Sequence, residues 1–441
     1  MSQTTHLHSS STQPVPRSLV FRRAALSLAT VCLLGACEVS VRIGGKGGGG
    51  ADGGQHDGGA GDWAGTFDGG EAGGGDAGGG DALGPSRMPP PLHAPLTAAS
   101  KVDILFLIDD SNSMAPLQAK LRTRMPEFMK VLESAPFGMP DVHVAVVSSS
   151  LGAGIFGNVP GCQPGTVGNL DGNFQHKAGC GLHAGQTFLR STGGATPMTN
   201  FDGDIADVFS CIANLGQNGC GFEHQLESVR LALQKAQTSG NENSGFLRPD
   251  ALLAVVFLTN EDDCSVPADS MLFDPNQQSV SDPLGGLQSY RCNEFGHLCD
   301  QNMPHTGPNG ALMMTNCRSR EDGKLIRING FIDYLYSLKP GAPQNVFVAL
   351  IAGPTAPYVV QPREAMLANG GVEVQPTVAH SCTGTVADFE YADPAVRLGE
   401  VAQAFSPNSV VASICADDYA GTMDEIARQM VFPRERENPA P

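Results

Sequence analysis

The chain has 441 residues and a formal net charge of −18, with 45 acidic and 27 basic residues. Such a charge repels nucleic acid and anionic lipid surfaces, which argues against a nucleic-acid-binding protein. The length accommodates one α/β domain with large loops or two compact domains.

The chain begins with the pattern of an export signal. Three arginines between residues 17 and 23 precede a largely apolar run over residues 24–36, shorter than the roughly 20 residues of a membrane span. The run ends in Leu34-Gly35-Ala36-Cys37, which resembles the bacterial lipobox. This resemblance implies a lipoprotein signal peptide over residues 1–36 and a lipid anchor on Cys37. An ordinary cleaved signal followed by a chance cysteine is the alternative, and the residues flanking the arginine pair fit twin-arginine export poorly.

Residues 37–100 are predicted to form a disordered linker. Glycine makes up about half of residues 44–84, and the apolar surface there is too small to offset the entropy of ordering. A stiffer proline-rich stretch closes the linker, and residues 433–441 are predicted to be a disordered tail.

Strands that alternate with helices predict an α/β fold with a doubly wound, mainly parallel sheet. Continuous apolar runs are typical of strands that are buried on both faces. Pro126 is expected to kink or break the helix that contains it. The predicted strands are 102–108, 142–148, 186–190 (weaker, at an edge), 251–258, 345–352 and 410–414, and the predicted helices are 117–133, 204–214, 222–237, 326–338, 396–405 and 422–430.

Two segments, 149–185 and 264–325, are too long for ordinary connections. Both contain cysteines and many Gly, Pro and Asn residues, which favours disulfide-bearing insertions in a domain that spans 101–432. Each segment leaves from the carboxyl end of a predicted strand, the edge where open α/β sheets bind ligands.

Ten cysteines follow Cys37, and an even number in an exported chain indicates disulfides. Short spacing makes Cys162–Cys180 and Cys211–Cys220 the first expected pairs, and Cys382–Cys415 would fasten the C-terminal region. Zinc binding is the less favoured alternative for two groups, which are Cys180 with His183 and Cys292 with His297 and Cys299.

The sequence Asp109-x-Ser111-x-Ser113 follows the first buried strand. One carboxylate and two hydroxyls on a tight turn supply part of an oxygen cage that suits Mg²⁺, and also Mn²⁺ or Ca²⁺. The motif resembles the metal-ion-dependent adhesion site of the von Willebrand factor A (VWA) family. The element order over about 101–430 is similar to that fold. The resemblance implies one open coordination position, which a carboxylate of a protein partner completes.

The motif at 109–113 is the first loop of the family's site. The second loop, here residues 219–223, and the third loop, here residues 259–263, depart from the family's pattern. A threonine is expected near Gly219-Cys220-Gly221-Phe222-Glu223, where Glu223 is the nearest oxygen donor. An aspartate is expected where Asn260 stands, with Asp262 close behind it. A metal could then bind through the first motif with Glu223 or Asp262 substituting. The alternative is a degenerate site that holds only water, in which Asp109 and Ser111 are turn and capping residues.

Weaker patterns have structural explanations. The stretch from Thr199 to Asp204 looks like a metal loop but precedes a helix, where Asp202 or Asp204 would serve as a cap. His143, inside a strand, is more simply a packed histidine. The serines at 148–150 are most simply a strand end.

Three functions follow, and we expect the first. It is a cell-envelope lipoprotein, attached to the membrane by its lipid anchor alone, that binds or adheres to a protein through a divalent metal and an acidic side chain of the partner. The anchored protein would lie on the periplasmic face of a membrane or at the cell surface. The second is a metal-assisted hydrolase, which only the acidic run 261–263 supports. The third is a structural lipoprotein with an inert metal site.

Overall fold

A computed structural model of the chain describes residues 99–432, apart from residues 137, 160, 163–170, 195, 302, 308, 368–369 and 386–389. The predicted signal peptide, Cys37, the linker up to residue 98 and the predicted tail at 433–441 lie outside the described residues.

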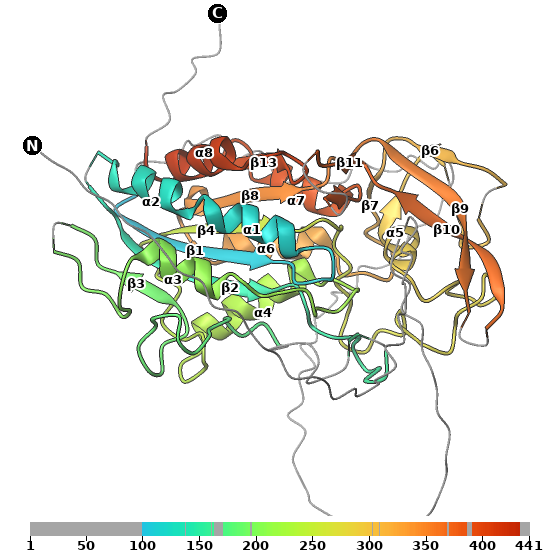
Figure 1. Ribbon diagram of the computed structural model, residues 1–441, viewed down its shortest axis with the longest axis horizontal. Coiled ribbons are helices and arrows are strands. Elements are labelled where there is room, and N and C mark those ends of the chain that lie inside the picture. Colours follow the sequence, from blue (N-terminus) through green and yellow to red (C-terminus); the bar gives the residue numbers. More distant parts are fainter. Residues whose placement is uncertain are drawn as a thin grey trace, which may run out of the picture. The chain divides into compact units, whose positions relative to one another are not determined.

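The centre of the described chain is a six-stranded sheet with the strand order β13-β8-β4-β1-β2-β3 (Figure 1). Five strands are parallel, and β3 pairs antiparallel with β2 at one edge. This confirms the α/β fold, the mainly parallel sheet and the weak edge strand. The bounds are β1 (Lys101–Ile108), β2 (Asp141–Ser148), β3 (Leu189–Ser191), β4 (Leu252–Leu258), β8 (Val346–Ala352) and β13 (Ser409–Ser413).

The order in which strands are added to the sheet changes sides between β1 and β4. From β1 the chain moves to β2 and β3 on one side, and it then returns to β4 on the other side of β1. In open α/β sheets, the carboxyl ends of strands at such a switch point border the ligand crevice. Asp109 follows β1, and Thr259 and Asn260 follow β4, so the first and third loops of the candidate site lie next to each other.

Helices cover both faces of the sheet because the β1 side chains alternate between two apolar cores. Ile104, Phe106 and Ile108 belong to the first core, while Leu105 and Leu107 belong to the second. The helices of the first core are α1 (Ala115–Thr123), α2 (Met125–Glu133), α3 (Ile205–Ile212) and α8 (Ala420–Val431). The helices of the second are α4 (Gln225–Gln237), α6 (Ile328–Ser337) and α7 (Val396–Ala404).

The predicted break at Pro126 is confirmed. Helix α1 ends before Arg124, and Pro126 lies in the first turn of α2, where a missing N–H costs no helical hydrogen bond.

Residues 264–325 fold together with a segment that the sequence did not single out, residues 353–395. We call these two segments the inserted region. They share a small apolar core around Tyr358 and Val360. Figure 1 shows β9 and β10 as a ribbon beyond the end of the central sheet. The elements of this region are α5 (Tyr290–Gly296), β5 (His297–Leu298), β6 (Leu312–Met314), β7 (Arg318–Ser319), β9 (Tyr358–Met366), β10 (Val372–Ala379), β11 (Cys382–Thr383) and β12 (Tyr391–Ala392), and the short helix η1 (Pro343–Asn345) precedes β8.

Five disulfides join all ten cysteines that follow Cys37. The predicted Cys382–Cys415 bond is confirmed. The predicted pairs Cys162–Cys180 and Cys211–Cys220 are wrong, because folding brings partners together across loops, not along the shortest stretch of sequence. The other bonds are Cys162–Cys220, Cys180–Cys211, Cys264–Cys292 and Cys299–Cys317.

This disulfide content is that of a protein from an oxidising compartment, extracellular or in the cell envelope. In the part of the chain that the structure describes, no helix combines the length and the apolar character that crossing a membrane requires.

Candidate metal-binding site

Asp109 is fully buried at the carboxyl end of β1. Its Oδ1 accepts a hydrogen bond of 2.8 Å from the backbone N–H of Ser111, which closes a tight turn. Its Oδ2 accepts a hydrogen bond of 2.7 Å from the hydroxyl of Thr259, at the end of the neighbouring strand β4. Burial raises the pKa of Asp109 to about 6, and these hydrogen bonds oppose the rise.

Asn260 connects the third loop to the first. Its Nδ2 donates to the Ser113 hydroxyl over 2.8 Å and to the carbonyl of Tyr391 over 3.1 Å. Its Oδ1 is buried and has no hydrogen-bond partner, and the same is true of the Ser111 hydroxyl. Two oxygen atoms from the predicted ligand set are therefore buried with their lone pairs unused.

Asp110 joins the first loop to the second. Its Oδ1 accepts hydrogen bonds from the hydroxyls of Ser148, over 2.7 Å, and Ser150, over 2.9 Å. The Ser150 hydroxyl in turn accepts a hydrogen bond from the backbone N–H of Cys220. Burial raises the pKa of Asp110, although both serine hydrogen bonds lower it. The serines after β2 are therefore more than a strand end, since they position the second loop.

Gly219 fits against Asp110 with no room for a side chain. Its N–H donates to the Asp110 carbonyl over 2.6 Å, and a Cβ at this position would lie 2.5 Å from Asp110 Oδ1. We expect Gly219→Ala to lower the free energy of unfolding by about 1–3 kcal/mol, because the backbone must shift to accommodate the methyl group. Urea unfolding of the variant and of the unaltered chain measures this difference in free energy. Gly221→Ala is the matched control, since its methyl group would meet nothing within 4 Å. Equal stability of the two variants would contradict the prediction.

Glu223 lies where the second loop enters α4, and only 1% of its surface is exposed. Its Oε1 has no hydrogen-bond partner. Burial raises its pKa well above the ordinary value, and the nearby charges of Glu261 and Asp109 raise it further. Glu261 contacts the Glu223 carboxyl, and burial raises the pKa of Glu261 to about 8, with the charges of Asp393 and Asp109 adding to the effect.

The carboxylate of Asp262 has four polar partners. Its Oδ1 accepts from the N–H groups of Asp263 and Leu398, and its Oδ2 accepts from the Arg397 N–H and bonds to His297 Nε2 at 2.9 Å. Burial alone would raise its pKa, but these partners lower it below the ordinary value. Its acceptor sites are taken up by the start of α7, by His297 and by the neighbouring N–H of Asp263, so Asp262 has no part in the proposal below.

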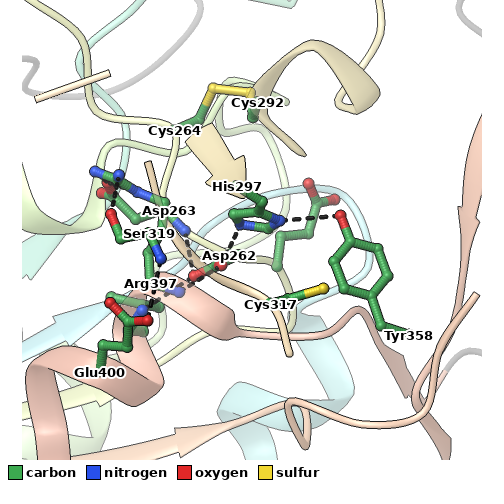
Figure 2. A network of polar contacts seen from close by, with 12 residues as sticks. Asp262, Asp263, Cys264, Cys292, His297, Cys317, Ser319, Tyr358, Arg397 and Glu400 are labelled. Atoms are coloured by element: carbon green, nitrogen blue, oxygen red, sulfur yellow. Dashed lines mark hydrogen bonds and ion pairs between the residues drawn. A yellow bond between two sulfur atoms is a disulfide. The ribbon is translucent and has the colours of Figure 1, made fainter. Parts of the chain in front are cut away.

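Asp263 and Arg397 form a fully buried ion pair (Figure 2). Arg397 Nη2 lies 3.0 Å from Asp263 Oδ2, and its other N–H groups donate to the Ser319 hydroxyl and the Ile326 carbonyl. Asp263 Oδ1 accepts from the N–H of Leu226 in the first turn of α4. This pair therefore joins the third loop, α4, α7 and the inserted region.

His297 is buried between two polar partners, as Figure 2 shows. Its Nδ1 lies 2.9 Å from the Tyr358 hydroxyl, and its Nε2 contacts Asp262. Because Cys292 and Cys299 are in disulfides, the zinc alternative for this group is wrong.

The other weak patterns also have structural roles. Cys180 is in a disulfide, and His183 contacts Asp202, so no zinc group forms there. Asp204 caps α3, as expected, by accepting from the Ala206 N–H. The buried ring of His143 bonds to the Phe246 carbonyl, and desolvation lowers its pKa to about 4.

The donor set around Asp109 fits a hard divalent cation. Among the described residues, no group of three or more His, Cys, Asp or Glu side chains is arranged to hold a metal ion. The candidate ligands are instead mixed oxygen donors, of which three are buried and unpaired: Ser111 Oγ, Asn260 Oδ1 and Glu223 Oε1. An unpaired buried oxygen costs free energy, and a Mg²⁺, Mn²⁺ or Ca²⁺ ion would satisfy it.

Sequence reasoning missed Thr259, Asp110 and Glu261 as parts of the site. Thr259 directly precedes Asn260, so its place at the end of a buried strand was a usable signal. The contact between Glu223 and Glu261 joins residues from separate loops and has no local signature.

No known family model matches the chain, and no curated protein matches it either. Among solved structures, the X-ray structure of an inactive zymogen of a C11 protease from Parabacteroides distasonis is similar over 63% of this chain, with 10% identity and a TM-score of 0.21. This chain spans about half of that structure, 52% of its length.

Proposed function

We propose that this chain is an envelope lipoprotein whose folded domain is VWA-like and binds a protein partner in a divalent-metal-dependent manner. The observation that carries this proposal is that one candidate ligand oxygen on each of the three loops is buried without a hydrogen-bond partner: Ser111 Oγ, Glu223 Oε1 and Asn260 Oδ1. Native proteins leave few buried oxygens without partners, so one on each loop of the candidate site favours a bound cation.

Two further observations support the VWA resemblance. The central sheet has the strand order of a doubly wound fold, with its antiparallel strand at the edge. The loops after β1 and β4 lie at the switch point, and Asp109 bonds across it to Thr259. The lipid anchor on Cys37 is proposed from the lipobox, and the disulfides support export.

The chain's own residues prepare the site before any ion binds. The Ser111 N–H and the Thr259 hydroxyl fix the two oxygens of Asp109, and Asn260 orients the Ser113 hydroxyl. A bound Mg²⁺ would supply a positive charge on an otherwise acidic chain, which favours an acidic group of a partner over a basic one.

The test is calorimetric titration of the full-length chain with Mg²⁺, Mn²⁺ and Ca²⁺. We expect one ion to bind per chain, and Asp109→Ala to abolish this binding, because it removes the central carboxylate. Asp207→Ala is the control, since Asp207 lies in the first turn of α3, outside the site. Equal titration of the unaltered chain and Asp109→Ala would refute the metal site.

A further inference from the structure

The third loop attaches to the inserted region or α7 through four consecutive residues. Each of the four residues makes its own polar or covalent contact. The four contacts are a hydrogen bond of Glu261 with Ser289, the Asp262–His297 bond, the Asp263–Arg397 ion pair and the Cys264–Cys292 disulfide.

Glu223 is the side chain through which a cation could reach this attachment. Its Oε1 is buried without a partner, and its carboxyl contacts Glu261. Glu261 in turn contacts Ser289, at the residue before α5. A series of polar contacts therefore runs from the carboxyl group of Glu223, through Glu261, to Ser289 of the inserted region.

The space beside Glu223 and Glu261 is small and only partly enclosed. A cavity of about 10 Å³ is lined by carboxyl groups, including Glu223 and Glu261, and by Ser289 and Asn293 of the inserted region. This volume admits one species of the size of water, not a partner's side chain. Asp109, Ser111 and Asn260 are also buried, at 0%, 4% and 1% exposure.

We propose that Glu223, positioned by Glu261, supplies the acidic ligand of the ion from within the chain, so that the bound ion fastens the inserted region to the central sheet. The inference rests on the proposed function in one respect, that an ion binds beside Asp109. In this inference, the Glu223 carboxylate takes the place at the ion that the VWA resemblance gives to a carboxylate of the partner. The metal dependence of partner binding then arises from ordering of the inserted region.

Titration of variants tests the ligand. We expect Glu223→Gln to weaken ion binding by about 100-fold or more, since loss of even an outer-shell group costs roughly 10–100-fold. Glu227→Gln, in the first turn of the adjoining helix α4, is the matched control, because the Glu227 carboxylate pairs with Arg230. If the unaltered chain binds no ion, the proposed function is wrong. Equal affinity of Glu223→Gln and the unaltered chain would leave the metal site standing and overturn this inference alone.

Hydrogen exchange tests the attachment without reference to any activity. We expect saturating Mg²⁺ to slow exchange in peptides covering residues 286–298, while peptides from α8 serve as an internal reference. Ser289→Ala keeps every proposed ligand, so it should bind Mg²⁺ as tightly as the unaltered chain. In this variant, the factor by which Mg²⁺ slows exchange should be about tenfold smaller, because one hydrogen bond to a charged group is lost. Absence of protection in the ion-loaded unaltered chain, or full protection in Ser289→Ala, would overturn the inference.

Discussion

Replacing Arg397 with Met is expected to lower the free energy of unfolding by about 3–5 kcal/mol. Arg397 and Asp263 are both fully buried, and the guanidinium also donates to the Ser319 hydroxyl and the Ile326 carbonyl. Met fills much of the volume but leaves the Asp263 charge, the Ser319 hydroxyl and the Ile326 carbonyl without their partner. The cost therefore comes mainly from the stranded carboxylate, not from loss of the pair's attraction.

Urea unfolding measures this effect, and two further variants assign its cause. Arg428→Met removes an exposed arginine that pairs with Asp424 on α8, so its unfolding midpoint should not change measurably. The double variant Arg397→Met with Asp263→Asn should recover part of the loss, because no buried charge remains unpaired. If the double variant is less stable than Arg397→Met alone, the stranded charge is not the cause.

The ion-free chain is expected to become less stable as the pH rises from 6.5 to 8. Burial raises the pKa of Glu261 to about 8 from the 4.5 of a free carboxyl, so the folded state keeps a proton in this window that the unfolded state has lost. Stability therefore falls with pH, by about 1.4 kcal/mol per pH unit for one proton, or about 2 kcal/mol over the window. Burial lowers the pKa of His143 to about 4 and also lowers the pKa of His224, so both oppose this trend, but only near pH 6.5, where the unfolded histidines still lose protons.

Thermal or urea unfolding at several pH values, in the presence of a chelator, checks the trend. Saturating Mg²⁺ should stabilise the chain more at pH 8 than at pH 6.5, because the ion replaces the proton at the carboxyl groups. Glu261→Gln removes a titrating group and should flatten the profile. An ion-free profile that is level or rises across this window would show that Glu261 does not keep a proton in the folded state.

The regular part of the fold could be predicted because its signals are local. Apolar runs predicted the five parallel strands of the central sheet, and Pro126 predicted the break between α1 and α2. The weaker edge strand, expected over 186–190, overlaps β3 at residues 189 and 190. The hairpin of β9 and β10 lacked such a signal. Pro362 and Pro376 lie opposite each other within it, and proline ordinarily argues against a strand.

The candidate site could be predicted only loop by loop. Asp109, Ser111 and Ser113 belong to one short motif, so their proximity follows from the sequence. Asn260 does meet Ser113, but Asp262 is taken up by the start of α7 and His297, which lies 35 positions further along the chain. Pairings over such separations depend on how the inserted region packs, and neither spacing nor composition encodes that.

The Cys162–Cys220 bond determines when the second loop becomes fixed, as well as where. Cys220 stands between Gly219, which packs on Asp110, and Glu223, so the bond fixes the part of the chain that carries Glu223 toward Asp109. Thiols stay reduced in the cytosol and pair only after export. A newly made chain would therefore reach the oxidising compartment before this loop is fastened, and the cation site that we propose would be completed only there.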